Sequence, residues 1–173
     1  MEYSSKILEV LNFLKDHGID YDIYQHPPLF TIQEAMDYWK QIDVSHTEGN
    51  ECVHCKNLFM RNHKGNRHYL ISYICHKDLD IHSLEHMLHQ GKLSFASPER
   101  LMKVLGLVPG SVNPFSLIND NEKEVTFFLD KNVMTGELLN FHPNVNYKMV
   151  TISLDDLKKY LDSIGVVINP VEI

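Results

Sequence analysis

The spacing of apolar positions predicts a helix near the start of the chain, and cap residues predict another near its end. Between residues 4 and 17, apolar side chains recur with helical spacing at Ile7, Leu8, Leu11 and Leu14. Gly18 ends this pattern, as a glycine often does after the last turn of a helix. Toward the other end, Ser153 is placed to cap a helix that Gly165 ends. We therefore expect one helix near each end of the chain.

Three further helices are predicted between these two. Thr31 and Glu34 have the spacing of a capping box, and the helix they open would bury Ala35 and Trp39. A second helix covers residues 81–90 and ends at Gly91. A third begins at Ser97 and Pro98 and ends at Gly106, with proline at its first position.

Strands alternate with these helices along the chain. Residues 56–61 and 68–74 are rich in Leu, Phe, Tyr and Ile, and the polar residues 62–66 between them predict a hairpin. Other apolar runs predict strands at 21–24, 125–129, 147–152 and 166–168, and one before His142. This order predicts a single α/β (α+β) domain over residues 1–173, with a mixed, largely antiparallel sheet and flanking helices.

Composition fits this expectation and narrows the class of protein. Hydrophobic residues make up 43% and charged residues 23%, which are ordinary globular values. The first residues do not show a secretory signal, and no apolar run approaches the ~20 residues of a membrane helix. Three cysteines are an odd number for a disulfide framework. We expect a cytoplasmic protein that does not enter a membrane.

One stretch departs from the acidic net charge of −7. Between Cys52 and Lys77 there are five Lys or Arg residues and no Asp or Glu. A basic island on an acidic protein is a candidate nucleic-acid contact, and its exposed members would be Arg61, Lys64 and Arg67. The alternative is a solvated hairpin whose basic side chains bind nothing.

The segment 106–115 is the strongest candidate for a substrate-binding loop. It holds two glycines and two prolines in ten residues, so it cannot form regular structure. Such a loop can direct backbone N–H groups at one oxyanion. It can equally be a rigid connection between a helix and a strand.

Three other positions are candidates for binding chemistry. Lys56 shares one face of its predicted strand with Leu58 and Met60, where an ammonium group can meet an anion or a carbonyl. A lysine that protects an edge strand is the alternative. His142 can position a substrate, whereas Asn144 and Asn146 are also typical turn residues.

Metal and nucleotide motifs are weak or missing in the sequence. Cys52 and Cys55 have the spacing of half a zinc site, which Cys75 and nearby histidines would have to complete. The sequence contains no glycine-rich phosphate fingerprint, no G-x-S-x-G and no H-E-x-x-H. The sequence therefore does not indicate a nucleotide cofactor, and a zinc site that includes Cys52, Cys55 and Cys75 stays an alternative.

Taken together, these motifs resemble the YbaK and prolyl-tRNA synthetase-associated editing domain family. The resemblance covers residues 21–165 and depends on the order and spacing of several segments. These are His26-Pro27 with Thr31 and Glu34, Lys56-Asn57-Leu58-Phe59, Leu79-Asp80, the loop 106–115, and His142-Pro143-Asn144-Val145-Asn146. The lysine and histidine segments are most similar to the stand-alone ProX-type subgroup, which deacylates alanyl-tRNA(Pro).

The resemblance implies hydrolysis of a mischarged aminoacyl-tRNA ester by water, without a covalent intermediate, a metal or a cofactor. The residues it places in the reaction are Lys56, Gly110, Ser111 and His142. The expected substrate-binding residues are Thr31, Gly106, Pro109, Phe115, Asn144 and Asn146. The expected partner is the acceptor end of mischarged tRNA(Pro), bound by a monomer. An alternative is a Cys-tRNA(Pro) deacylase, and a second is a non-catalytic module that senses an amino acid or a charged tRNA.

Overall fold

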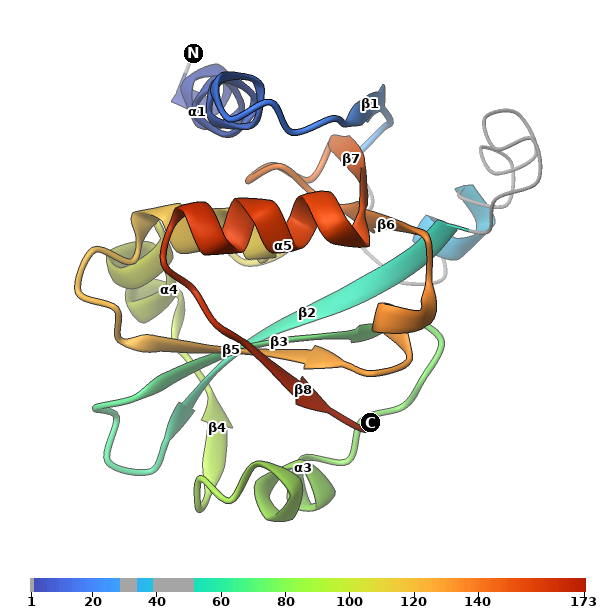
Figure 1. The fold of residues 1–173 in the computed structure, drawn as a ribbon. Coiled ribbons are helices and arrows are strands. Elements are labelled where there is room, and N and C mark those ends of the chain that lie inside the picture. Colours follow the sequence, from blue (N-terminus) through green and yellow to red (C-terminus); the bar gives the residue numbers. More distant parts are fainter. Residues whose placement is uncertain (1, 29–33, 39–51) are drawn as a thin grey trace.

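One mixed sheet organises the described part of the computed structural model, which comprises residues 2–28, 34–38 and 52–173. The sheet has eight strands in the order β1-β7-β6-β2-β3-β5-β8, and β4 pairs with β2 off this path. The strands are β1 (Asp22–Gln25), β2 (Cys52–Asn62), β3 (His68–Ile74), β4 (Leu93–Phe95), β5 (Val125–Asp130), β6 (Leu138–Phe141), β7 (Lys148–Ser153) and β8 (Ile168–Val171). Figure 1 shows β2 crossing the centre of the molecule.

The strand β2 joins the two halves of the sheet. Its first residues pair in parallel with β6, and its residues from Cys55 onward form the antiparallel hairpin with β3. The other antiparallel pairs are β1–β7, β6–β7 and β2–β4, and the other parallel pairs are β3–β5 and β5–β8. The predicted mixed sheet and its hairpin are therefore confirmed.

The helices begin and end close to the positions that the sequence predicts. The described ones include α1 (Glu2–Asp16), α3 (Ile81–Leu88), α4 (Pro98–Leu105) and α5 (Leu154–Ser163), with the 3-10 helices η1 (Pro114–Asn119) and η2 (Val133–Thr135). Residues 34–38, within the helix predicted after Thr31, are also helical. Ser97 caps α4 by accepting from the Arg100 N–H, and Ser153 caps α5 through the Asp156 N–H. The helix α3 ends earlier than predicted, because His89 itself takes the left-handed conformation two residues before Gly91.

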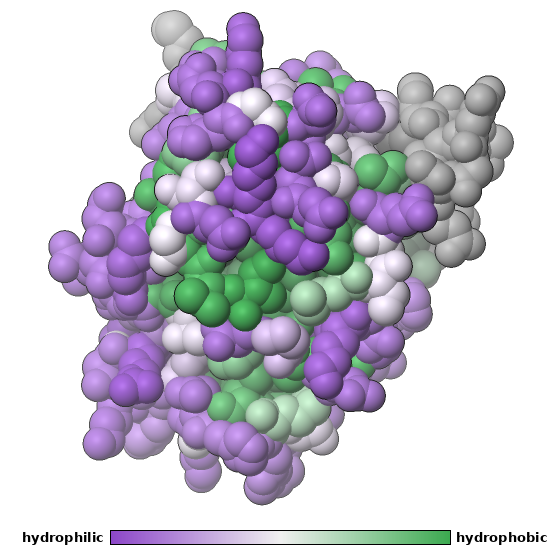
Figure 2. All heavy atoms as spheres, viewed as in Figure 1, coloured by the Kyte–Doolittle hydropathy of each residue, from purple (hydrophilic) through white to green (hydrophobic). Residues whose placement is uncertain are grey.

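Helices cover both faces of the β2–β3–β5 part of the sheet. Because successive side chains of a strand point to opposite faces, the hydrophobic core around this part of the sheet forms two clusters, one on each face. Phe127 and Leu129 of β5 belong to a large cluster with residues of α1, α4 and α5, whereas Phe128 belongs to a smaller cluster with α3. In Figure 1, α5 and α3 accordingly lie on opposite sides of β5. Figure 2 shows hydrophobic residues across the middle of this view and hydrophilic residues above and below them.

Some expected elements differ from the structure or lie outside it. The loop 106–115 is irregular only as far as Asn113, because Pro114 and Phe115 begin η1. The last strand begins at Ile168, two residues after its predicted start, and the short β4 was not predicted. Ala35 is buried as expected, whereas Thr31 and Trp39 lie outside the described residues. Among the described helices, none has the length and apolar character that a membrane span requires.

Candidate active site

Two loops from distant parts of the sequence form a small pocket of about 200 Å³. One loop follows α4, and the other connects β6 to β7. The lining residues are Val108, Pro109, Ser111, Asn144, Val145, Asn146 and Tyr147. None of these side chains carries a formal charge at neutral pH, so the pocket can bind a small group through apolar contacts and hydrogen bonds.

The path of the first loop is fixed by two left-handed glycines and a tight turn. Gly106 ends α4 with φ 66°, and Gly110 has φ 88°. The N–H and the hydroxyl of Ser111 both donate to the carbonyl of Val108, at 3.2 and 2.7 Å. A Cβ on Gly110 would meet no atom within 4 Å. Gly110 is therefore required for its backbone conformation and not for close packing.

A pair of buried amides joins the two loops behind the pocket. The Asn113 Nδ2 group donates to Asn144 Oδ1 at 3.0 Å and to the Ser111 carbonyl at 2.7 Å. Asn113 is 0% exposed and Asn144 2%. Asn113 Oδ1 and Asn144 Nδ2 have no hydrogen-bond partner in the described part of the chain. Because buried polar groups are nearly always paired, this unused acceptor and donor are candidates for contact with a ligand.

One histidine, His142, lies in the second loop, and another, His26, packs beside it. The rings of His26 and His142 are 5.3 Å apart, and the His26 N–H donates to the carbonyl of Tyr147, which lines the pocket. The Nδ1 atom of His26 donates to the Pro27 carbonyl at 2.8 Å, whereas neither Nε2 atom has a partner in the described ranges. Burial, and to a smaller extent His26, lowers the pKa of His142 from 6.5 to about 4. His142 is thus a neutral hydrogen-bonding group at physiological pH.

Lys56 lies on β2, outside the residues that line this pocket. As predicted, it shares a strand face with Leu58 and Met60, both of which pack in the cluster beneath α3. Its Nζ donates to the Lys77 carbonyl over a long 3.4 Å and lies 5.9 Å from the centre of the Tyr73 ring. Both contacts are long, so they hold the ammonium group only weakly.

The predicted site residues therefore divide into separate groups. Pro109, Ser111, Asn144 and Asn146 line the pocket, and Gly110 lies between them in the loop. Gly106 instead ends α4, where its carbonyl accepts from Lys6. Phe115 is fully buried in the core, with its ring edge-on to Phe141 and Tyr160. The predicted substrate contact at Thr31 lies outside the described residues.

Some residues around the pocket were not singled out in the sequence. Val108, Val145 and Tyr147 line it, and Asn113 joins its two loops. The position of Asn113 inside the glycine- and proline-containing loop was the only available signal, because its partner Asn144 is 31 residues away.

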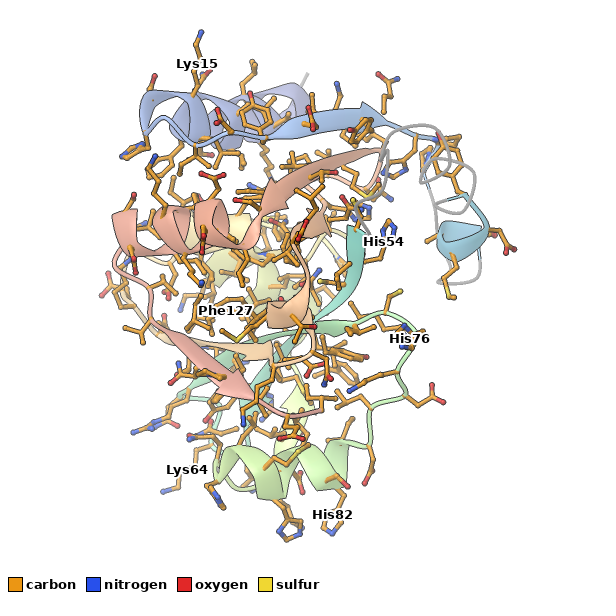
Figure 3. The ribbon with its side chains drawn as sticks, turned by 45° about the vertical axis from the view of Figure 1, so that its right-hand side comes forward. Lys15, His54, Lys64, His76, His82 and Phe127 are labelled. Carbon is orange, nitrogen blue, oxygen red and sulfur yellow. The ribbon has the colours of Figure 1, made fainter. Side chains whose placement is uncertain are left out.

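The turn between β2 and β3, residues 63–67, is here called the basic turn. It lies away from the end of β2 that pairs with β6. Asn62 is eight residues beyond His54, which is about 26 Å along an extended strand. Figure 3 shows His54 and Lys64 toward opposite ends of the molecule. Lys64 and Arg67 are exposed, whereas the Arg61 Nη1 group donates to the carbonyls of Asn62 and His63 at 3.0 and 3.2 Å. Arg61 therefore stabilises the turn that presents the other two.

The cysteines do not form a recognisable metal site. Cys52, Cys55 and Cys75 are not joined in disulfides, and burial followed by proximity to Cys75 raises the pKa of Cys55 well above its usual value. Within residues 2–28, 34–38 and 52–173, no three His, Cys, Asp or Glu side chains are grouped as metal ligands would be.

The family model for the aminoacyl-tRNA editing domain matches residues 26–160. The chain belongs to this family. The matched range contains both loops of the pocket, Lys56 and the basic turn, so the geometry described above is that of an editing domain.

Individual relatives of this editing domain extend the similarity to the whole chain. The prolyl-tRNA editing protein ProX of Acetoanaerobium sticklandii is 34% identical over 100% of this chain and 99% of its own length. The prolyl-tRNA synthetase associated domain-containing protein 1 of Danio rerio is 31% identical over 89% of this chain and 80% of its own. A solved structure of a proposed trans-editing enzyme for prolyl tRNA synthetase has a TM-score of 0.68 at 18% identity, covering 97% of both chains. This last similarity concerns the fold.

Proposed function

We propose that this protein is a trans-editing deacylase that hydrolyses the ester of mischarged tRNA(Pro), with alanine as the preferred aminoacyl group. The observation that carries the proposal is the pocket of about 200 Å³ between two rigid loops of an editing domain. Drug-sized ligands occupy pockets of about 300–1,000 Å³, so this pocket suits a small side chain. The full-length similarity to a prolyl-tRNA editing protein supports tRNA(Pro) as the carrier.

The chemistry requires positioning more than a strong nucleophile. A water molecule attacks the ester carbonyl, a tetrahedral oxyanion forms, and the ribose oxygen of the terminal adenosine leaves with a proton. Because an aminoacyl ester is already activated, orientation and stabilisation of the oxyanion can supply much of the rate. The Ser111 hydroxyl donates to Val108 at 2.7 Å, which favours a structural role over a covalent one.

Three groups complete the proposed mechanism. Lys56, which the resemblance to the editing-domain family places in the reaction and whose described contacts are long, is assigned the positive charge for the developing oxyanion. His142, neutral because its pKa is about 4, contributes the unpartnered Nε2 atom as a hydrogen-bonding group that orients the substrate. The walls formed by Val108, Pro109 and Val145 limit the size of the side chain and thereby exclude larger residues.

The first experiment compares tRNA(Pro) charged separately with labelled alanine, cysteine and proline. We expect rapid release of alanine, slow release of cysteine and stable prolyl-tRNA. Preferential release of cysteine would keep the deacylase activity and change its specificity. Binding of charged tRNA without release of any amino acid would instead support the non-catalytic sensing module and refute the proposed reaction.

A further inference from the structure

The outer face of α4 joins the basic turn to the pocket. The Nη1 group of Arg100, in the first turn of α4, donates to the Gly65 carbonyl at 2.8 Å. Its guanidinium group lies so close to the turn that a Cβ on Gly65 would be only 2.9 Å from Nη2. Gly65 also has φ 70°, which favours glycine. The turn and the helix are therefore held together as one surface.

Lys103 continues this surface toward the pocket. It is exposed and follows Arg100 by three residues, so the two side chains are neighbours on one face of α4. One further turn along this face is Gly106, and the rim of the pocket begins at Val108. A basic strip formed by Lys64, Arg67, Arg100 and Lys103 thus leads from the hairpin to the pocket.

We propose that this basic strip binds the phosphates of the acceptor arm whose aminoacyl end enters the pocket. The inference rests on the proposed function and adds α4, and Lys103 in particular, to the RNA-binding surface. The eight residues of α4 span about 12 Å. At about 3.4 Å per nucleotide along a strand, that length fits three to four nucleotides between the pocket and the turn.

Neighbouring charges favour an anionic partner at this strip. The helix α4 contains one acidic residue, Glu99, whose carboxylate hydrogen-bonds Ser97 at the start of the helix, and this interaction lowers its pKa. Glu124 lies 3.4 Å from His68 at the base of the hairpin. On a chain with a net charge of −7, a strip of four basic residues gives local, salt-sensitive binding of RNA.

The test uses Lys103→Ala, with Lys15→Ala as the matched control. Both lysines are exposed on helices, and Figure 3 shows Lys15 on α1 at the opposite end of the molecule from Lys64. Binding of uncharged tRNA(Pro) is measured between about 50 and 200 mM salt. Loss of one phosphate contact should lower the slope of log affinity against log salt by about 1. The wild type should then lose about threefold more affinity than Lys103→Ala over this range, and Lys15→Ala should match the wild type.

A short substrate separates this surface from the chemistry. The aminoacyl ester of adenosine alone, which is too short to reach Lys103, should be hydrolysed equally by the wild type and by Lys103→Ala, whereas full-length charged tRNA should be hydrolysed more slowly by the variant at low salt. An unchanged salt slope in Lys103→Ala, or an equal change in Lys15→Ala, would overturn the basic strip. If the wild type binds tRNA but hydrolyses no ester, the proposed function fails while the binding slopes still decide this inference.

Discussion

The pocket loops and the hairpin turn differ in the burial and in the charge of their polar side chains. The pocket loops are held by buried, uncharged groups such as Asn113 and Asn144, and several polar atoms there have no partner among the described residues. At the hairpin turn, the Asn62 side chain satisfies the N–H groups of Asn66 and Arg67, and the exposed side chains carry positive charge. The polar groups that hold the pocket loops are therefore buried and neutral, whereas those that the hairpin turn presents are exposed and charged.

Because of this difference, we expect the pocket to determine which aminoacyl group is accepted and the basic strip to determine the affinity for the RNA backbone. Buried polar groups in a small cavity discriminate strongly, because a wrong ligand leaves them unpaired at a cost of about 1–3 kcal/mol each. Exposed lysines and arginines attract any phosphate backbone and lose strength with salt. We therefore expect substitutions around the pocket to change rate and stability, and substitutions on the basic strip to change the salt dependence of binding.

Lys56→Ala should cause the largest effect. Loss of a charge that stabilises the oxyanion should slow deacylation by about 10²–10³-fold, the range found when one such donor is removed. Single-turnover release of alanine from tRNA(Pro) measures this effect, with Lys15→Ala as the control. A Lys56→Ala rate equal to that of the wild type would show that the charge takes no part in the reaction, and Lys56 would remain a structural residue of β2.

Acid should destabilise the protein through His142. The unfolded chain binds this proton near pH 6.5, whereas the folded protein does so only near pH 4. The contribution of His142 to stability is therefore complete above pH 6.5 and falls as the pH decreases toward 4, by up to about 3 kcal/mol. Denaturant unfolding of His142→Asn should show a weaker pH dependence across this window, and His63→Asn, at an exposed position of the hairpin turn, should follow the wild type.

Asn113→Ala tests whether the amide pair holds the two loops together. The substitution leaves the Ser111 carbonyl and Asn144 Oδ1 without their buried donor, so the free energy of unfolding should fall by about 2 kcal/mol. Asn12→Ala, at an exposed position of α1, should change it by less than about 0.5 kcal/mol. Equal stability of the two variants would mean that the loops do not depend on this bridge.

Gly110→Ala should have the smallest effect of the four. An alanine Cβ has open space at this position, so the cost comes from the positive φ alone and should be about 1 kcal/mol. Gly110→Asn should cost less, because asparagine tolerates the left-handed region better. Thermal unfolding of the two variants gives the comparison. A loss of several kcal/mol in both would indicate a packing role that the geometry does not show.

Much of the fold follows from local patterns in the sequence. Apolar spacing located α1, and the cap and stop residues Ser97, Gly106 and Ser153 located α4 and α5, because capping depends on neighbouring backbone groups alone. The β2–β3 hairpin was equally visible, since a polar turn between two apolar runs is a local signal. The short strand β4 was missed because its three residues pair only with a distant part of β2.

The sequence by itself determined the helices, the hairpin, the basic turn and the glycine- and proline-containing loop, because each depends on residues close together in the chain. Only the tertiary structure decided that Asn113 meets Asn144, that Arg100 holds the hairpin turn and that Phe115 packs in the core. These contacts join segments 31 to 45 residues apart. Their formation depends on how the sheet and helices pack. Before that packing is known, an asparagine, an arginine or a phenylalanine could equally lie in the core, in a loop or on the surface.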